Sequence, residues 1–234
     1  STVNQIVDVL KRLNFKVNGI VYEGLSSSQI LLSLEDRQKG AVLIDIGSGF
    51  TKGAIFQNGI LYRNFVLPIG GDMFTYDIAK CLQISVPEAE RIKILFGDVD
   101  LDQISVQDTL DIVTVTGESK SIKLMLLCQI LEARAKELCM LIKKKLPALV
   151  NNNYCLVVSG GGGKLKGFSK VLQTSLLDLD CFGEEVSVRS DESDSNYFSA
   201  IGLVSYGLKT SAIYYSNVSK RTMLSKWLKL IPGL

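Results

Sequence analysis

The sequence predicts an α/β fold in which helices pack on a mixed β-sheet. Two observations predict this class: the segments follow the order β-β-β-α, then α-β, then α, and glycine-rich turns follow the strands. The chain has 234 residues, of which 47% are hydrophobic and 21% are charged, which is typical of a folded protein with a sizeable core.

The first 40 residues are expected to form two helices with a strand between them. Apolar residues at helical spacing predict an amphipathic helix over residues 1–14. A strand is expected over residues 16–22, and a helix from the small-residue stretch 24–28 through Leu34. The apolar residues of the first helix are Val3, Ile6, Val7, Leu10 and Leu13.

Residues 41–66 are predicted to form an antiparallel meander with strands at 41–46, 51–57 and 60–66. Asn58-Gly59 joins the last two strands and is a strong hairpin signal. Pro68 and two glycines end the meander, and Asp72 is the expected N-cap of the next helix.

Helices predominate in the rest of the chain. Pro87 starts a helix that ends at Phe96, and the polar segment 97–120 contains one short strand, 111–116. The longest helix is expected over residues 121–146. A buried strand at 154–159, a helix from about Gly167, a strand at 186–189 and a helix at 197–208 complete the folded part.

The composition excludes several function classes. The chain has no His, which excludes Ser-His-Asp and Cys-His catalysis and His-based metal sites. Its five cysteines are odd in number and scattered, as expected for reduced thiols in a cytosolic protein. No apolar run reaches the roughly 18 to 20 residues of a spanning helix, and no signal peptide is expected at the start.

The first candidate site follows the strand at 41–46. Asp45 lies near its end, and Gly47 and Gly49 lie in the turn, where backbone amides without Cβ atoms can approach phosphate oxygens. One Asp at this place also suits Mg²⁺, which prefers one or two carboxylates together with phosphates. A tight hairpin with turn glycines and a capping Asp explains the same pattern.

Two further candidates remain open at the level of residue patterns. Four consecutive glycines, Gly160, Gly161, Gly162 and Gly163, follow a strand and allow the backbone to lie flat beneath a ring or a phosphate. They match neither the P-loop nor the dinucleotide fingerprint, and a flexible connector is the alternative. Glu90 and Lys93 share one helix face, either as a surface ion pair or as groups that reach a ribose or a base.

Taken together, these motifs resemble the actin, sugar kinase and DnaK-type ATPase superfamily, and most closely the FtsA family of bacterial actin-like cell-division proteins. The resemblance covers nearly the whole chain. It rests on residues 41–53, on 70–79 with Thr75 and Asp77, on 89–93, on Glu132, Arg134 and Glu137, on 157–168 and on 200–207.

The resemblance implies a role for each matching residue. Gly47, Ser48, Gly49, Phe50 and Thr51 would form a phosphate loop, with Asp45 near Mg²⁺ through water. Gly70, Gly71 and Asp72 would lie by the phosphates, Glu90 and Lys93 would contact ribose and adenine, and residues 160–163 would form the adenosine loop of a bound ATP.

Two kinds of departure from the family pattern limit the implied chemistry. Phe50 and Lys52 stand where bacterial members usually carry Thr and Asp. The family's first phosphate hairpin and its opposing carboxylates are expected upstream of Ser1, so the chain resembles the second lobe with the end of the first. We therefore expect ATP binding with weak or absent hydrolysis.

Residues 219–234 are predicted to form an interfacial membrane helix. Apolar residues recur at i, i+3, i+4 and i+7, and basic residues lie opposite. This pattern resembles the membrane-targeting helix of FtsA proteins, and a terminal helix packed on its own domain is the alternative. The expected membrane-binding residues are Lys220, Arg221, Leu224, Lys226, Trp227, Leu228, Lys229 and Ile231.

The charged residues are also unevenly distributed, with an excess of basic residues in the predicted membrane helix. Residues 220–229 hold four basic and no acidic side chains, which leaves 22 Lys and Arg against 24 Asp and Glu elsewhere, a net charge of −2. A basic tail on a mildly acidic body favours an anionic membrane surface over nucleic acid as the partner. The expected organisation is residues 1–40 as the end of the first lobe, 41–209 as the second lobe with a small insertion at 97–120, a linker at 210–218, and the tail.

The resemblance implies a cell-division protein at the cytoplasmic face of the bacterial membrane, at the division site. Its implied partners are FtsZ, further copies of itself in filaments, an anionic membrane and other divisome proteins, with no nucleic acid. Two alternatives are a PilM-like scaffold of type IV pilus assembly and half of a sugar kinase or chaperone-type ATPase, neither of which needs the basic amphipathic tail.

Overall fold

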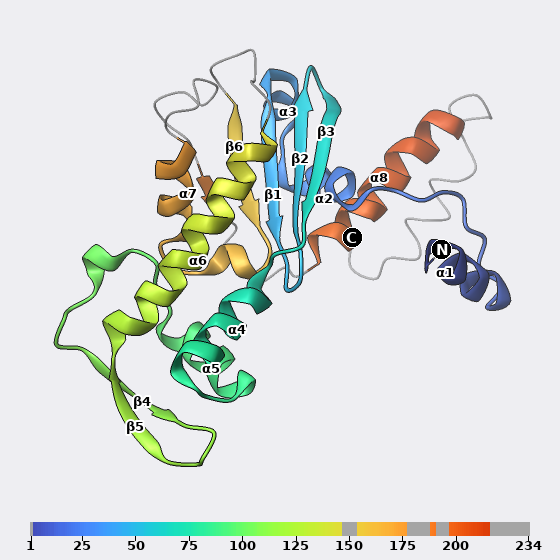
Figure 1. Ribbon diagram of the computed structural model, residues 1–234. Coiled ribbons are helices and arrows are strands. Elements are labelled where there is room, and N and C mark those ends of the chain that lie inside the picture. The colour runs from blue at the N-terminus through green and yellow to red at the C-terminus, as the bar shows by residue number, and fades with distance from the viewer. Residues whose placement is uncertain (1, 147–153, 177–187, 191–196, 216–234) are drawn as a thin grey trace, which may run out of the picture. The chain divides into compact units, whose positions relative to one another are not determined.

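The computed structural model describes residues 2–146, 154–176, 188–190 and 197–215 (Figure 1). The chain forms two compact units. The larger spans Leu31–Tyr197, and the smaller combines Ser1–Ile30 with Phe198–Leu234.

The larger unit is built on a five-stranded mixed sheet in the order β3-β2-β1-β6-β7. β1 (Ala41–Ile46), β2 (Thr51–Gln57) and β3 (Ile60–Leu67) are antiparallel neighbours, so the predicted meander is confirmed. β6 (Cys155–Ser159) pairs in parallel with β1, and β7 (Val188–Ser190) pairs in parallel with β6. The predicted mixed sheet is therefore present.

The sheet register brings the chemistry-bearing strand ends together. Asp45 of β1 pairs with Lys52 of β2 on one side and with Ser159 of β6 on the other. Because β1 and β6 run in parallel, the turns that follow them leave from the same edge of the sheet.

Two helices cover one face of this sheet: α6 (Leu124–Lys145) and α7 (Phe168–Leu176) (Figure 1). Alternate residues of β1 point toward them, as the period of two in a strand requires. Full burial of each such apolar side chain contributes about 1.5 to 3 kcal/mol, so this layer is the main core. Its fully buried members include Val42, Ile44, Ile46, Leu127, Leu131, Leu138, Phe168 and Leu172.

A second layer extends from the end of β3. It consists of α4 (Gly71–Leu82), α5 (Val86–Phe96), a 3₁₀ turn (Leu101–Gln103) and the hairpin of β4 (Thr109–Val113) and β5 (Ser119–Lys123). The carboxylate of Glu88 accepts a hydrogen bond from the amide of Val113, which joins α5 to the hairpin. In Figure 1 the hairpin extends away from the main sheet.

The smaller unit contains α1 (Thr2–Arg12), α2 (Glu23–Leu31) and α8 (Phe198–Tyr215). α2 and α8 pack closely through small residues. A Cβ atom on Gly202 would lie 2.0 Å from the carbonyl oxygen of Ser26, so only glycine fits this helix contact. The hydroxyl of Ser199 donates to Glu23 at 2.9 Å and strengthens the same contact.

Two predictions for the first 40 residues are wrong. Residues 16–22 form no strand, because a strand needs a hydrogen-bonded neighbour and no described strand pairs with this segment. The helix predicted through Leu34 ends at Leu31, and a separate helix, α3 (Leu34–Lys39), follows. Ser33 caps α3 and forms a capping box with Asp36, a local signal that competes with helix continuation.

The polar segment 97–120 also differs from the expectation of one strand. Residues 111–116 belong to a hairpin whose turn contains Gly117 with φ of +84°, and β5 occupies the first residues of the predicted helix 121–146. That helix begins at Leu124 because residues 119–123 pair with β4 instead.

Three helix and strand bounds need correction as well. Gly70, not Asp72, is the N-cap of α4. α8 continues to Tyr215, beyond the predicted end at Leu208 and into the expected linker, because no Gly or Pro interrupts residues 208–215. β7 extends to Ser190, one residue beyond the predicted end at Arg189, and residues 186–187 of the predicted strand lie outside the described part of the chain.

Candidate functional site

Two glycine turns lie side by side at the carboxyl edge of the sheet. The turn after β1 is closed by a hydrogen bond of 2.9 Å from the amide of Gly47 to the carbonyl of Phe50. After β6, Gly160 adopts φ of +85°, and a Cβ there would lie 2.4 Å from Oδ1 of Asp45. The two turns are in contact because the second has glycine at this point.

The sequence suggested that the backbone of the four consecutive glycines could lie flat, but it does not. Gly161–Lys164 form a 3₁₀ turn. Cβ atoms on Gly162 and Gly163 would approach Ile46 and Val158 to 2.4 and 2.7 Å, whereas nothing lies within 4 Å of such an atom on Gly161. Packing therefore requires most of these glycines, and the backbone at Gly161 is open.

The start of α4 is docked on the first turn. The amides of Gly71 and Asp72 donate to the carbonyl oxygens of Gly47 and Ser48 at 2.8 and 2.9 Å. The hydroxyl of Ser48 donates in return to Oδ2 of Asp72 at 2.7 Å. The structure thus brings the predicted residues 47–48 and 70–72 together, with these two helix amides already bonded to the turn.

The loop that leads into α4 is fixed by a buried hydroxyl. Thr51, which has no exposed surface, donates its hydroxyl hydrogen to the carbonyl of Ile69 at 2.7 Å. Phe50, the neighbouring residue of the predicted phosphate loop, is 54% exposed. The two residues of the same predicted loop therefore differ: Thr51 holds the fold, and Phe50 presents an aromatic ring to solvent.

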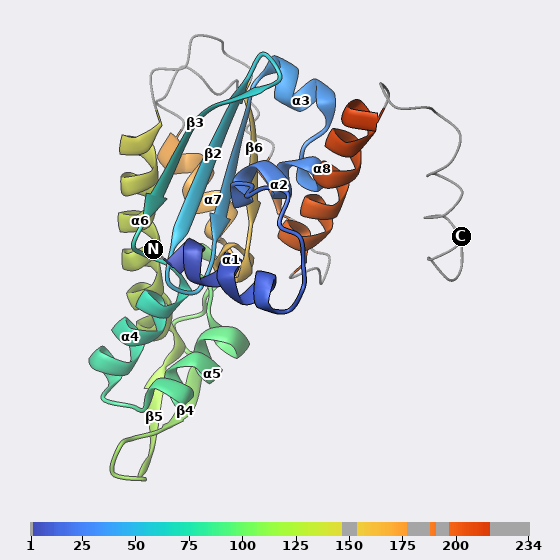
Figure 2. The same ribbon diagram turned by 90° about the vertical axis from the view of Figure 1, so that its right-hand side faces the viewer.

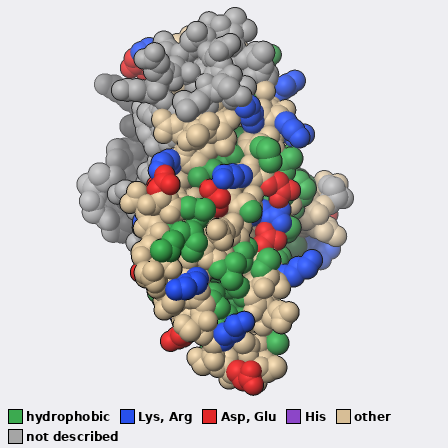
Figure 3. All heavy atoms as spheres, turned by 60° about the vertical axis from the view of Figure 1, so that its left-hand side comes forward, with side chains coloured by type: hydrophobic (Ala, Val, Ile, Leu, Met, Phe, Trp, Pro, Cys, Tyr) green, Lys and Arg blue, Asp and Glu red, His purple; other side chains and the backbone are tan. Residues whose placement is uncertain are grey.

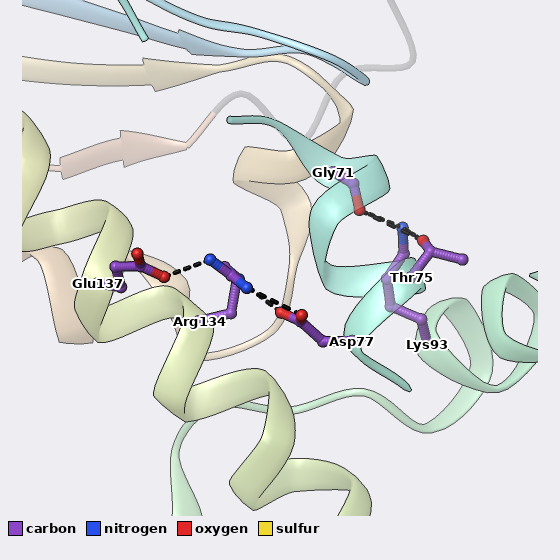
Figure 4. Close-up of polar contacts among 6 residues, drawn as sticks. All are labelled: Gly71, Thr75, Asp77, Lys93, Arg134 and Glu137. Carbon is purple, nitrogen blue, oxygen red and sulfur yellow. Dashed lines mark hydrogen bonds and ion pairs between the residues drawn. The ribbon is translucent and has the colours of Figure 1, made fainter. Parts of the chain in front are cut away.

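Lys93 of α5 is held against the first turn of α4 (Figure 4). Its ammonium donates to the carbonyl of Gly71 at 3.1 Å and to the hydroxyl of Thr75 at 2.8 Å, and it pairs with Glu90 at 2.7 Å. An ammonium group has three hydrogens, so these partners satisfy it fully. A ligand contact by Lys93 requires the exchange of one of them.

Glu90 completes this cluster. Partial burial acts to raise its pKa, but hydrogen bonds from Lys93 and Thr75 outweigh that effect and leave the pKa lowered. Thr75 donates its hydroxyl hydrogen to the carboxylate of Glu90. The sequence identified Thr75 only through the family resemblance, because nothing local predicts that its hydroxyl meets a residue on the next helix.

Arg134 of α6 joins the same helix from the other side (Figure 4). Its guanidinium bonds both oxygens of Asp77 on α4 and also donates to Glu137. These contacts raise the pKa of Arg134, the hydrogen bond to Asp77 most of all. α4 is therefore anchored both to α5 and to the core helix α6.

The carboxylates near the two turns are Asp45 and Asp72. Asp45 is half-buried, and its register partner Lys52 lies on the same face of the sheet, because directly opposed residues of antiparallel strands share a face. Among the described residues, no three His, Cys, Asp or Glu side chains gather closely enough to hold a metal ion.

None of the cysteines among the described residues forms a disulfide bond. Cys81 is exposed, and Cys128 and Cys139 are buried on α6. Burial raises the pKa of Cys139 to about 12, so this thiol is protonated at physiological pH and unreactive.

The predicted membrane-binding residues, Lys220 to Ile231, lie outside the described residues. Within the described part of the chain, no helix has the length and hydropathy needed to cross a membrane.

Comparison with known proteins identifies the family. The family described as cell division protein FtsA matches residues 42–202. The FtsA of Bacillus subtilis is 26% identical over 218 residues, which cover 90% of this chain and 48% of that protein. The FtsA of Escherichia coli K12 is 26% identical over 240 residues, which cover 96% of this chain and 57% of that protein. The chain thus spans about half the length of these relatives.

Solved structures agree on the fold. The structure of MreB 5 of Spiroplasma citri bound to AMPPNP matches this chain with a TM-score of 0.71 at 17% identity. The match covers 92% of this chain and 66% of the MreB 5 chain. A chain of the PilM–PilN complex of type IV pilus biogenesis matches with a TM-score of 0.55 at 16% identity. This match covers 88% of this chain and 57% of that chain. Both levels of identity show a shared fold alone. The chain has an actin-like fold and belongs to the cell division protein FtsA family.

Proposed function

We propose that this chain is part of a bacterial cell-division protein that binds ATP with Mg²⁺, assembles into filaments and anchors the FtsZ ring to the cytoplasmic membrane. Membership of the FtsA family supports the role in cell division. The observation that carries the nucleotide part is the pair of glycine turns, one after β1 and one after β6, in contact at one edge of the sheet. In open α/β sheets, ligands bind outside the carboxyl ends of the strands.

The residues present fit a nucleotide at this edge. Gly49 and Gly161 have open space where a side chain would be, so a ligand can approach their backbone closely. Residues 47–51 would hold phosphates, residues 160–163 the adenosine, and Glu90 with Lys93 the ribose and base. The nucleotide in the MreB 5 structure supports this proposal by fold likeness.

Mg²⁺ would be held by the phosphates and, through water, by Asp45. Lys52 lies opposite this carboxylate in the sheet. The site therefore offers the metal one carboxylate, where an acidic residue in place of Lys52 would offer two. Phe50 and Lys52 stand where the family resemblance implies Thr and Asp. We therefore infer that hydrolysis by this chain is weak or absent.

A titration with a fluorescent ATP analogue tests nucleotide binding. The full chain is expected to bind the analogue more tightly with Mg²⁺ than with EDTA. Gly161→Ala should weaken binding by about tenfold without lowering thermal stability, because its methyl group meets no protein atom. Gly19→Ala, which is equally unobstructed and distant in sequence, is the control. Equal binding by both variants would place the ligand elsewhere.

A phosphate-release assay tests hydrolysis. We expect less than one turnover per chain over an hour in isolation. Repeated turnover by the purified chain would contradict the proposed weak hydrolysis.

The basic amphipathic tail supports membrane attachment. Each basic residue near an anionic leaflet contributes about 1 kcal/mol, so the four basic residues of 220–229 favour reversible binding. The chain with residues 1–234 should sediment with phosphatidylglycerol vesicles and bring FtsZ with it. A chain that ends at residue 218 should do neither, and equal sedimentation of both forms would refute the role of the tail.

Exposed apolar side chains support self-association. Ile94, Leu95 and Phe96 at the end of α5 are 70%, 61% and 42% exposed. Figure 3 shows hydrophobic side chains interspersed with charged ones on one face. Electron microscopy with ATP should reveal filaments, and Ile94→Glu should reduce their number.

A further inference from the structure

A hollow of about 640 Å³ lies at the end of the main sheet opposite the glycine turns. α3 and the turn between β2 and β3 form its walls, and Figures 1 and 2 both show these two elements side by side. Its lining includes Leu34, Glu35, Arg37, Gln38, Asn58 and Ile60. We call it the Arg37 hollow.

Arg37 is the unusual member of this lining. The residue is only 8% exposed, and its Nε has no hydrogen-bond partner. Its guanidinium makes no ion pair with any residue in the described part of the chain. Burial lowers the pKa of Arg37, the shift expected of a cation removed from water without a partner.

The main chain of Arg37 is firmly held. Its amide donates to the carbonyl of Ser33 at 3.2 Å, and its carbonyl accepts from the amide of Gly59 at 2.9 Å. A Cβ on Gly59 would lie 2.8 Å from the amide oxygen of Gln38, so the hairpin turn and α3 fit tightly here. The guanidinium is thus carried on a rigid support.

The acidic neighbours of Arg37 are engaged elsewhere. Asp36 accepts the backbone amide of Ser33 in the capping box, and Glu35 pairs with Lys39 at 2.6 Å. Neither neutralises Arg37, because both point to partners on their own helix. A buried guanidinium in this state is stabilised by an external anion.

A carboxylate is the anion that suits the hollow. The two terminal nitrogens of a guanidinium can form parallel hydrogen bonds with the two carboxylate oxygens, and in Arg37 only the inner nitrogen Nε is enclosed by protein. A phosphate dianion would bring twice the charge to a single cation, with the carboxylate of Glu35 also in the lining. Leu34 and Ile60, 78% and 66% exposed, add apolar surface beside it.

We propose that the Arg37 hollow binds a peptide segment that presents a carboxylate side chain next to an apolar side chain. Arg37 receives the carboxylate, the amides of Gln38 and Asn58 are available to the peptide backbone, and Leu34 with Ile60 contact the apolar side chain. The hollow is separate from the glycine turns, so this binding does not depend on a nucleotide.

The test uses the full chain and pairs of fluorescein-labelled peptides, such as Gly-Glu-Leu-Gly-Glu-Leu-Gly and its twin with Gln in place of Glu. Fluorescence anisotropy should show at least tenfold tighter binding of the acidic peptide. Arg37→Met should remove this preference, Arg37→Lys should weaken it, and Arg63→Met, which removes an exposed arginine of β3, should leave it unchanged.

A second measurement separates a binding role from a structural one. Arg37→Met should unfold at the same temperature as the parent or higher, because it removes a buried cation without a partner. The Nε–H resonance of Arg37 should shift on addition of the acidic peptide and not of its twin. Equal binding of the twins, tighter binding of a phosphoserine peptide, or a loss of stability in Arg37→Met would each overturn the proposal.

Discussion

Arg134 of α6 holds both carboxylate oxygens of Asp77 on α4. Nε donates to Oδ2 at 2.5 Å, and Nη2 donates to Oδ1 at 2.8 Å. The side chains are 17% and 26% exposed, so water screens the pair only in part. Two parallel hydrogen bonds fix the relative orientation of the helices as well as their separation. Because α4 begins at the glycine turn, this pair connects the candidate site to the core.

Removal of either partner of this pair is expected to destabilise the protein. Asp77→Asn and Arg134→Gln should each lower the free energy of unfolding by about 1 to 3 kcal/mol, since each leaves a partly buried charge without its partner. Urea unfolding of both single variants and of the double variant measures their coupling. Lys39→Gln, which removes a pair with Glu35 whose side chains are 67% and 72% exposed, should cost less than about 0.5 kcal/mol. Strictly additive losses would show that the two side chains do not cooperate.

The stabilisation by Glu90 should depend on pH. Its pKa in the folded protein is below the ordinary value of 4.5, so its contribution is present above that value and is lost as the pH falls through the folded pKa. The difference in melting temperature between the parent and Glu90→Gln should therefore be largest near neutral pH and shrink below pH 4.5. Glu118→Gln, at an exposed position in the β4–β5 turn, is the control. A difference that grows on acidification would contradict the assignment.

Gly70 should tolerate no side chain. A Cβ atom there would lie 2.3 Å from the carbonyl oxygen of Ser48 and 2.5 Å from that of Gly47. Both oxygens already accept hydrogen bonds from backbone amides at the start of α4. Gly70→Ala should lower the free energy of unfolding by about 1 to 3 kcal/mol. Gly49→Ala, where nothing lies within 4 Å, should leave it unchanged. Thermal unfolding compares the two, and equal stability would mean that the turn moves away without cost.

Lys52 provides a test of the proposed metal dependence. Lys52→Asp would place a second carboxylate directly opposite Asp45 on the same sheet face. Like charges at opposed positions repel, so the variant without ligand should be less stable, by a few tenths to 1 kcal/mol. Its binding of an ATP analogue should depend more strongly on Mg²⁺ than that of the parent. Lys52→Gln is the neutral control, and identical Mg²⁺ dependence in all three chains would argue against a metal near Asp45.

Prediction from the sequence succeeded where the signal was local. Asn58-Gly59 specified the β2–β3 turn, and Pro87 marked the first turn of α5, because turn and helix-start geometry depend on a few adjacent residues. It failed at residues 16–22, which have strand-like composition but no neighbouring strand. It also missed β5, whose pairing with β4 depends on the turn at Gly117 and overrides a helical pattern.

The sequence by itself determined the mixed α/β class, the meander and the two glycine turns. These features follow from hydrophobic periodicity and from residue types that favour particular turn conformations. Only the tertiary structure decided that α4 docks on the first turn, that Lys93 is fully bonded and that Arg37 is buried without a partner. Each of these depends on which side chains meet after the sheet and helices pack, and on how much water packing removes. Contacts between residues as distant as Asp77 and Arg134 have no local signal, because their partners come within reach only in the folded chain.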